Sequence, residues 1–391
     1  MIPALPINNS YLPFGRPNFG EKEVAAATRI LRSGWIGMGK ETIAFEKELA
    51  VYTGSRHTVA VNSCTSALHL ALLVNGVGTG DEVIVPSLTW CSSANAALYV
   101  GAKPVFCDID PHTLCLTSAL VLARLSRRTK AVVVVHFGGY AVDVRALRRA
   151  LPNRVLIVED AAHALGATYP NGQPVGSSGN LVCFSFYPNK NLATAEGGAI
   201  ALNNAKTADR LRSLSQHALP VNAWKRFTHA KTVFLSGDLS ELGFKMNFTD
   251  LQAAIARVQL RRQLEFARRR LQIARHYLRR LRALQPRLSF QAGITAAGHA
   301  RHLFVILLPP KHPGLPLRDD LLQALRLRNI GATIHYAPLH YMPLYRHNRR
   351  VLLPATERVY GGIMTLPISA SMTLKEVDYV CDHLVQLLGS R

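Results

Sequence analysis

The sequence predicts an α/β fold with a mainly parallel sheet in a large domain. In the first half of the chain, short apolar runs alternate with segments of helical character. Strands that are apolar throughout and separated by crossover helices are typical of a parallel sheet covered on both faces. After about residue 250 the pattern changes to long helices. We therefore expect a large domain over residues 1–250, the N-terminal segment included, and a smaller C-terminal α/β domain over 251–391.

The expected elements follow from these apolar runs in order. Strands are expected at 57–62, 82–86, 104–108, 130–136, 155–159 and 181–186. Helices are expected at 66–75, 92–100, 143–151 and 206–216. The second domain is expected to contain one long arginine-rich helix over 257–287, a strand over 302–308, and helices over 318–327 and 374–388. The arginines of the long helix interleave with apolar residues, which predicts an amphipathic helix with a basic face.

Composition limits the class of protein. At 391 residues and 48% hydrophobic residues, the chain can bury a sizeable core. The six cysteines show no CxxC spacing, so we expect neither a metal site nor a disulfide framework. Because no apolar run approaches the length of a membrane span and the chain does not start like a signal peptide, we expect a soluble, cytoplasmic protein.

The net charge of +22 is unusual and would ordinarily indicate a nucleic-acid or acidic membrane partner. Much of it lies in 257–287, on the basic face of the expected helix. Three interpretations follow: a solvated helix face, attraction of a polyanionic small substrate, or DNA binding. We favour the first and expect neither a nucleic-acid partner nor a membrane.

Two strand ends carry groups that could bind a cofactor. The turn Ser63–Ser66 lies between an expected strand and the start of a helix, where free N–H groups and the helix dipole attract a phosphate. An ordinary helix N-cap is the alternative there. Asp160 ends another strand, at the carboxyl edge where parallel sheets bind ligands. Its carboxylate could keep a pyridine nitrogen protonated, or it could cap the following turn.

Lys190 follows a further apolar strand. A partly desolvated lysine at that edge is a candidate for a depressed pKa and imine formation, although a lone lysine is more often a surface residue. His163 could lie near a cofactor's phenolic oxygen or satisfy a core hydrogen bond, and Trp90 could stack on a ring or belong to the core. Phosphate turn, aspartate and lysine at three strand ends, in this order, predict a pyridoxal phosphate (PLP) site.

The chain resembles the DegT/DnrJ/EryC1/StrS sugar aminotransferases, which are PLP enzymes of fold type I. The resemblance covers nearly the whole chain, and the matching segments are 14–17, 33–37, 80–86, 101–106, 135–139, 159–166, 184–190, 196–198, 247–254 and 335–340. Three positions depart from the family pattern: Cys64 and Ala218 stand where glycine is usual, and Lys245 stands where many members have asparagine. The Schiff-base lysine, which dehydratase relatives lack, is present as Lys190.

The resemblance implies a role for each site residue. Lys190 would form the internal aldimine, Asp160 would contact the pyridine nitrogen, and His163 would lie near the phenolic oxygen. Thr65, Ser66 and Ser185 would bind the phosphate, with Trp90 stacked on the ring. Members are typically homodimers whose active sites lie at the subunit interface. Lys245 or Asn247 would then contact the partner's cofactor phosphate.

The implied reaction is a ping-pong transamination. An amino acid, by family habit glutamate, would give its amino group to a keto-sugar carried on a nucleoside diphosphate. Candidates for binding that substrate are Trp35, Tyr187, Arg226, His335 and His340, with core packing as the alternative for the aromatic ones. Three other functions stay open: dehydration by the same fold, a PLP-binding regulatory protein, and a basic nucleic-acid binder.

Overall fold

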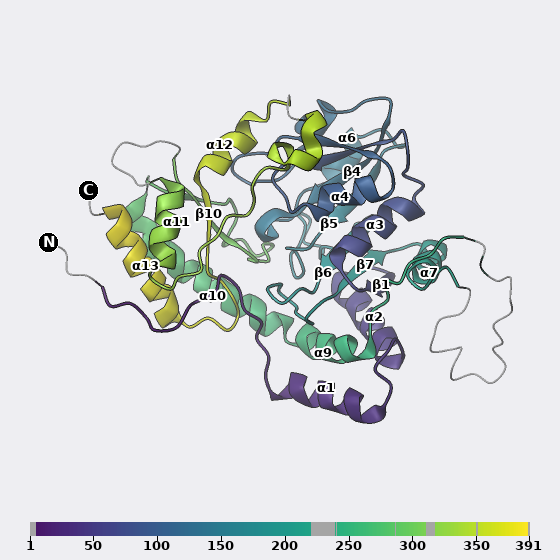
Figure 1. Cartoon of the computed structure of the whole chain (residues 1–391), viewed down its shortest axis with the longest axis horizontal. Helices are drawn as coiled ribbons and strands as arrows, with labels where there is room; N and C mark the ends of the chain where they lie inside the picture. Colours follow the sequence, from purple (N-terminus) through teal and green to yellow (C-terminus); the bar gives the residue numbers. More distant parts are fainter. Residues whose placement is uncertain are drawn as a thin grey trace.

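The fold is α/β, as predicted, with two β-sheets. The computed structural model describes residues 5–219, 239, 241–285, 287–309, 317–348 and 351–389. A seven-stranded sheet has the order β1-β7-β6-β5-β4-β2-β3, and a three-stranded sheet has the order β10-β9-β8. Figure 1 shows the large sheet on the right and the smaller one, with its helices, on the left.

The large sheet is mainly parallel. Its strands are β1 (His57–Val61), β2 (Glu82–Pro86), β3 (Lys103–Cys107), β4 (Thr129–Val135), β5 (Leu156–Asp160), β6 (Leu181–Ser185) and β7 (Gly198–Leu202). Strands β2 to β6 pair in parallel, whereas β7 runs antiparallel to both β6 and β1. The sequence predicted every strand of this sheet except β7, and it also missed the strands at 289–290 and 363–366 of the smaller sheet. That strand reads Gly-Ala-Ile-Ala-Leu, and its glycine and alanines have low strand propensity.

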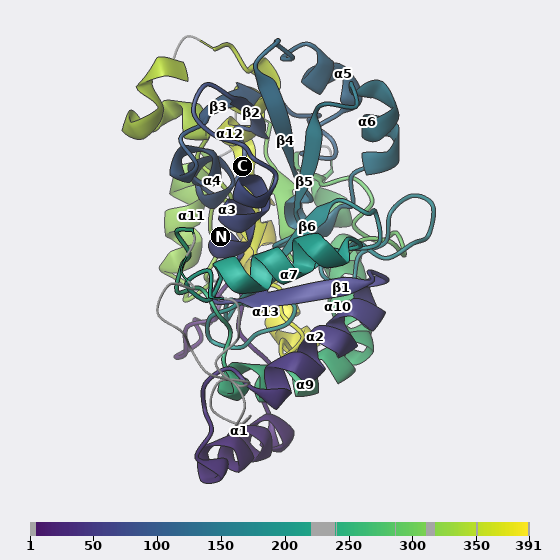
Figure 2. The same cartoon turned by 90° about the vertical axis from the view of Figure 1, so that its right-hand side faces the viewer.

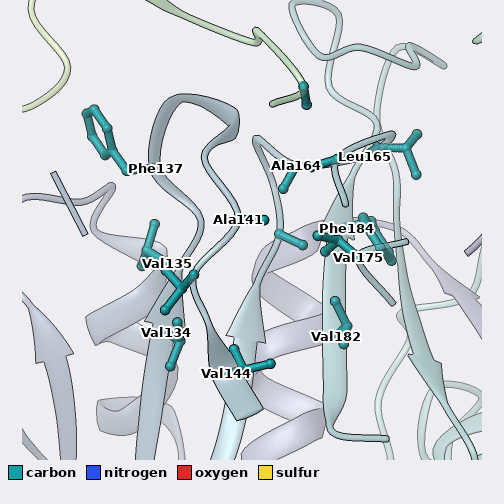
Figure 3. Close-up of a cluster of buried hydrophobic side chains, with 14 of the residues drawn as sticks. Val134, Val135, Phe137, Ala141, Val144, Ala164, Leu165, Val175, Val182 and Phe184 are labelled. Carbon is teal, nitrogen blue, oxygen red and sulfur yellow. The ribbon is translucent and has the colours of Figure 1, made fainter. Parts of the chain in front are cut away.

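Helices cover both faces of this sheet. One face carries α3 (Cys64–Val74), α4 (Ser92–Tyr99) and α7 (Ala205–Leu214), and the other carries α2 (Lys40–Thr53), α5 (Ser118–Leu122), α6 (Val144–Ala150) and α9 (Asp250–Arg261). Because successive strand residues point to opposite faces, β4 serves both cores. Val132 and Val134 face α2 and α6, whereas Ala131 and Val133 face α3 and α4. Figure 3 shows part of the first core, where Val134, Val144, Val182 and Phe184 gather.

The smaller sheet consists of β8 (Ser289–Phe290), β9 (Phe304–Leu307) and β10 (Ile363–Leu366), and it has its own core. The accompanying helices are α10 (Gln263–Leu281), α11 (Arg318–Arg326), α12 (Pro354–Gly362) and α13 (Leu374–Gly389). Tyr277 of α10 and Val380 of α13 are fully buried in this core, and the two helices lie side by side (Figure 1). The domain boundary at residue 250 stays a prediction.

Helix α1 and several short 3-10 segments complete the described fold. Helix α1 (Glu21–Ser33) lies at the opposite end of the molecule from α5 and α6 (Figure 2). In the part of the chain that the structure describes, four 3-10 segments occur: Phe137–Gly139, Arg282–Leu284, Leu339–Tyr341 and Pro343–Asn348. Among the described residues, no helix combines the length and the apolar character that crossing a membrane requires. All six cysteines are free thiols.

The prediction of one helix over 257–287 was wrong. Helix α9 ends at Arg261 and α10 begins at Gln263, with Arg262 between them in a non-helical conformation. Arg262 donates to the Asn18 carbonyl at 3.1 Å and to the Glu23 carboxylate at 2.9 Å. These contacts with a segment more than two hundred residues away fix the junction.

The first arginines of this region are also not simply a solvated face. Arg257 forms ion pairs with Glu41 and Glu48 of α2, and Arg261 also pairs with Glu48. Part of the positive charge is therefore neutralised where α9 packs against α2.

Candidate active site

A cavity of about 490 Å³ lies at the carboxyl edge of the parallel strands. It is lined by the ends of β4, β5 and β6, by the first turn of α3, and by residues 333–336. Eight residues selected from the sequence line it: Thr65, Trp90, Asp160, His163, Ser185, Tyr187, Lys190 and His335. Residues that lie up to 270 positions apart in the sequence (Thr65 and His335) thus meet at one site.

Lys190 lies in the loop after β6, where its N–H closes a turn onto the Tyr187 carbonyl at 2.9 Å. Burial lowers the pKa of Lys190 to about 8, and the nearby Asp160 carboxylate offsets only part of this effect. Its Nζ lies 3.5 Å from Nε2 of His302. At pH 7 roughly a tenth of this lysine is therefore an uncharged, nucleophilic amine, far more than an ordinary pKa of 10.5 would allow.

Asp160 ends β5 and is only 6% exposed. Its Oδ2 accepts a hydrogen bond from the Ser93 hydroxyl at 2.6 Å, and its Oδ1 accepts one from the Ala162 N–H at 3.1 Å. The carboxylate faces the cavity in a fixed orientation, as a partner for a protonated ring nitrogen requires.

The neighbouring carboxylate, Glu159, points to the opposite side of the sheet and is fully buried. It accepts hydrogen bonds from His136 at 2.8 Å, Tyr169 at 2.6 Å, Ser178 at 2.5 Å and Asn180 at 2.7 Å. Burial alone would raise the pKa of Glu159, but these donors hold it below its ordinary value. This network anchors the end of β5 and leaves Asp160 as the carboxylate of the cavity.

His163 lies beside the lysine as a neutral imidazole. Its Nδ1 accepts a hydrogen bond from the Gly138 N–H at 3.2 Å, so the proton lies on Nε2, which is 3.1 Å from the Tyr336 hydroxyl. Burial, together with Lys190 and His335, holds the pKa of His163 well below its ordinary value. The Nε2–H group is therefore a neutral donor at the cavity.

The turn before α3 has the geometry of a phosphate cradle. Ser63 caps the helix by accepting from the Ser66 N–H at 3.0 Å, and the first N–H groups of a helix lack intrahelical partners. The hydroxyl of Thr65 lies 2.8 Å from that of Ser92. The Ser66 hydroxyl instead donates to Asn62 at 2.6 Å, and neither residue lines the cavity. Cys64 is accommodated because its thiol contacts the Cys183 carbonyl at 3.6 Å.

Two glycines at the start of β7 occupy positions without room for a side chain, and Gly198 is the one that meets this turn. A Cβ on Gly198 would lie 2.5 Å from the backbone carbon of Ser63 and 2.6 Å from the nitrogen of Cys64. Gly197 has a φ of +153°, and a Cβ there would lie 2.5 Å from the Phe248 ring. The close contact between β7 and the phosphate turn thus requires glycine at 198, and the packing of Phe248 requires glycine at 197.

Five predicted residues lie outside this cavity lining, namely Ser66, Trp35, Lys245, Asn247 and His340, and one lies outside the described residues. Trp35 donates to the Met38 carbonyl at 3.2 Å, and buried His340 contacts the Ser87 hydroxyl at 2.7 Å. Lys245 is exposed and donates to Asn247 at 2.6 Å. Arg226 lies outside the described residues.

Sequence reasoning missed several residues of the site. Tyr336 reaches His163, and His302 stacks on His163 with ring centroids 4.4 Å apart. Ser92 and Ser93 begin α4 and contact Thr65 and Asp160. No local pattern identifies them, although Tyr336 and its neighbours belong to the matching segment 335–340. His302 begins a predicted strand, where a histidine suggests nothing by itself.

The donor set fits PLP. Lys190 offers an amine with a depressed pKa, Asp160 offers a buried carboxylate with one fixed orientation, and the first turn of α3 offers N–H groups with Thr65 and Ser185 beside it. These are the groups that the aldehyde, the pyridine nitrogen and the phosphate of that cofactor need.

Comparisons with known proteins agree with this reading. The family model described as the DegT/DnrJ/EryC1/StrS aminotransferase family matches residues 17–385. The spore coat polysaccharide biosynthesis protein SpsC of Bacillus subtilis (strain 168) is 39% identical over 379 residues, which is 96% of each chain.

Solved structures are similar over nearly the whole chain. The aminotransferase TlmJ from Streptoalloteichus hindustanus is 32% identical, with a TM-score of 0.88 over 97% of this chain and 100% of that one. A proposed sugar aminotransferase, Spr1654 from Streptococcus pneumoniae, is 30% identical in its PLP form, with a TM-score of 0.87 over 97% of this chain and 99% of that one. The chain therefore belongs to the DegT/DnrJ/EryC1/StrS family of PLP-dependent sugar aminotransferases.

Proposed function

We propose that this protein moves the amino group of an amino acid, with glutamate as the expected donor, onto a keto-sugar carried on a nucleoside diphosphate. The observation that carries the proposal is the convergence of Lys190, Asp160 and the start of α3 on one cavity. The presence of Lys190 favours amino transfer over the dehydration carried out by relatives that lack this lysine.

Each residue has a distinct task in this reaction. Bound PLP supplies an electron-withdrawing ring that stabilises negative charge at the donor's α-carbon. Asp160 would hold the ring nitrogen, and the first turn of α3 with Thr65 and Ser185 would hold the phosphate. Lys190 would bind the cofactor covalently and, once displaced by the donor, would take the proton from the α-carbon. Its pKa of about 8 suits a group that must both accept and release a proton.

The cavity wall supports a bulky substrate. Trp90 and Tyr187 both line the cavity and are 60% and 47% exposed. Exposed aromatic side chains at the mouth of a site offer a stacking surface for a PLP ring, a sugar or a base. The net charge of +22 would draw a diphosphate toward the protein.

We also propose a homodimer whose subunits share their active sites. Lys245 and Asn247 lie outside the cavity of their own chain, and Lys245 is exposed. That placement suits residues that serve the cofactor of a second subunit, as the family resemblance implies. The same resemblance is the reason to name a nucleotide as the carrier of the sugar.

The test is a product assay. Purified protein is incubated with PLP, glutamate and a panel of nucleotide-linked 3-keto and 4-keto sugars, and any product is identified by mass. We expect one keto-sugar to gain an amino group while glutamate becomes 2-oxoglutarate. Lys190→Ala should give no product, whereas Lys103→Ala, at an exposed lysine outside the cavity, should behave like the wild type. Product from Lys190→Ala, or loss of water without amino transfer, would contradict the proposal.

A further inference from the structure

Helix α4 begins with two serines that contact opposite ends of the candidate cofactor site. Ser92 Oγ lies 2.8 Å from the Thr65 hydroxyl at the phosphate turn. The next residue, Ser93, donates its hydroxyl to Oδ2 of Asp160 at 2.6 Å. One helical turn thus touches both the phosphate cradle and the carboxylate predicted to hold the ring nitrogen.

Ser93 is the inner member of a buried hydroxyl chain. Thr89 Oγ1 lies 2.9 Å from Ser93 Oγ, and Thr89 and Ser93 are 2% and 0% exposed. An ionised carboxylate can only accept, so the Ser93 proton points at Asp160. Ser93 has one hydroxyl proton, so its remaining contact must be an accepted one, and Thr89 must be the donor. Thr89 therefore donates its hydroxyl proton to Ser93, and Ser93 donates its own to Asp160.

The hydrogen-bonded hydroxyls of Thr89 and Ser93 act on Asp160 without placing a charge near it. A hydrogen bond donated to a carboxylate stabilises its negative form, and hydroxyls linked in series strengthen one another. The Ala162 N–H fixes the second oxygen, Oδ1, at 3.1 Å. Both oxygens are thereby oriented, and the negative charge that would keep a pyridine nitrogen protonated is stabilised from behind.

We infer that Ser93, supported by Thr89, is a positioning residue that holds the Asp160 carboxylate aligned with the ring nitrogen of the bound cofactor, and so keeps that nitrogen protonated. The inference rests on the proposed function, because it takes Asp160 as the partner of that nitrogen. Ser93 itself is not a catalytic residue, since it acts through Asp160.

The experiment compares the wild type and Ser93→Ala, both loaded with PLP labelled with ¹⁵N at the ring nitrogen. In the wild type we expect a ¹⁵N resonance at the position of a protonated pyridine. In Ser93→Ala the resonance should move toward that of unprotonated pyridine, and kcat should fall roughly tenfold or more because a buried acceptor loses its donor. The KM for the keto-sugar should stay unchanged, since the hydroxyl does not act on the sugar.

Three further variants distinguish a positioning role of Ser93 toward Asp160 from a purely structural role in the fold. Ser93→Thr keeps a hydroxyl and should restore the resonance and most of kcat. Thr89→Val removes the outer hydroxyl alone and should shift the resonance in the same direction by a smaller amount. Thr356→Val is the matched control, because it deletes a fully buried hydroxyl that donates to Asp108 at 2.7 Å, and it should leave the resonance unmoved.

Two results would overturn the inference. One is a protonated ¹⁵N resonance in Ser93→Ala that matches the wild type. The other is a loss of kcat in Ser93→Ala no larger than in Thr356→Val. Failure of the proposed function would look different, because the wild type itself would then bind no PLP at Lys190 or make no amino sugar.

Discussion

At the scale of single residues, the reactivity of the site comes from where each ionisable group is buried. Lys190, His163 and His335 all have pKa values lowered mainly by burial. The pKa of His335 falls to about 3, so this side chain stays neutral beside the lysine. A lysine surrounded by neutral imidazoles keeps a reactive amine without a neighbouring positive charge.

The depressed pKa of Lys190 predicts how cofactor capture depends on pH. Only the unprotonated amine can attack the aldehyde of PLP, so capture should speed up with rising pH and level off above about 8. A lysine with the ordinary pKa of 10.5 would still be accelerating at pH 10. The measurement is the rate at which visible absorbance appears when PLP is added to cofactor-free protein. A rate that keeps rising tenfold per pH unit through pH 9 would show that the pKa of Lys190 is not depressed.

Asp160→Asn tests the carboxylate with almost no change in size. The amide cannot keep a pyridine nitrogen protonated, so kcat should fall about tenfold to a hundredfold. Asp143→Asn is the control, because Asp143 caps α6 by accepting from Ala146 at 2.9 Å outside the cavity. It should leave kcat as in the wild type. Equal kcat in the two variants would remove Asp160 from the mechanism.

The sequence identifies residues at strand ends and misses those on other elements. Lys190, Asp160 and the turn at Ser63 were found because parallel strands place their carboxyl ends along one edge. Ser93 and Tyr336 were not, because a serine in the first turn of a helix and a tyrosine in a loop carry no periodic signal. Their roles depend on contacts across 67 and 173 residues.

At the scale of elements, β7 packs against the phosphate turn with no room for a side chain between them. Strand β7 runs antiparallel between β1 and β6, and its first residue, Gly198, leaves no room for a Cβ. The strand can pack closely against the turn because Gly198 has no side chain. The position of the α3 N-terminus depends on this contact.

Gly198→Ala should therefore displace the turn. The added methyl would overlap the backbone of Ser63 and Cys64, at 2.5 Å and 2.6 Å, and backbone cannot move aside cheaply. We expect the free energy of unfolding to fall by about 1 to 3 kcal/mol and PLP to bind more weakly. Denaturant unfolding and cofactor titration measure the two effects.

Gly78→Ala is the control for this substitution. Its nearest neighbour is the Val100 carbonyl oxygen at 3.8 Å, an ordinary contact distance. Its unfolding and PLP affinity should match those of the wild type. If Gly198→Ala also matched the wild type, the turn would not depend on this contact.

Apart from the helix over 257–287, the predicted strands and helices end within two residues of the observed ones, but β7, β8 and β10 were not predicted. An apolar run such as that of β4, which is buried on both faces, is enough by itself to predict a strand. The break at Arg262 could not be predicted, because the residues on either side keep a helical pattern. The break is fixed by Asn18 and Glu23, which the fold brings to it.

At the scale of the whole molecule, the arginines that contribute to the net charge of +22 lie in two kinds of environment. Arg257, Arg261 and Arg262 pair with glutamates of α1 and α2, where they hold helices together. Other arginines of α10, such as Arg268 and Arg275, line a surface hollow of about 370 Å³. The total charge can be counted from the sequence. Which arginines form ion pairs cannot be predicted from it, because the pairs depend on which helices pack together.

Shared active sites predict that two inactive variants rescue each other. Lys190→Ala lacks the amine, and a double variant with Lys245→Ala and Asn247→Ala lacks the groups proposed to reach the partner's phosphate. A heterodimer of the two holds one complete site. After dissociation and equal mixing, activity should return to about a quarter of the wild type, because half the dimers are mixed and each has one working site. Activity equal to the sum of the separate variants would show that each subunit works alone.

The central claim is that Lys190 holds the cofactor, and the most direct measurement is to fix that bond chemically. The PLP-loaded protein is reduced with borohydride, digested, and analysed by mass spectrometry. We expect a reduced pyridoxal phosphate adduct on the peptide that contains Lys190, and none in Lys190→Ala. An adduct confined to another lysine, or no adduct in a wild type that still transfers amino groups, would contradict it.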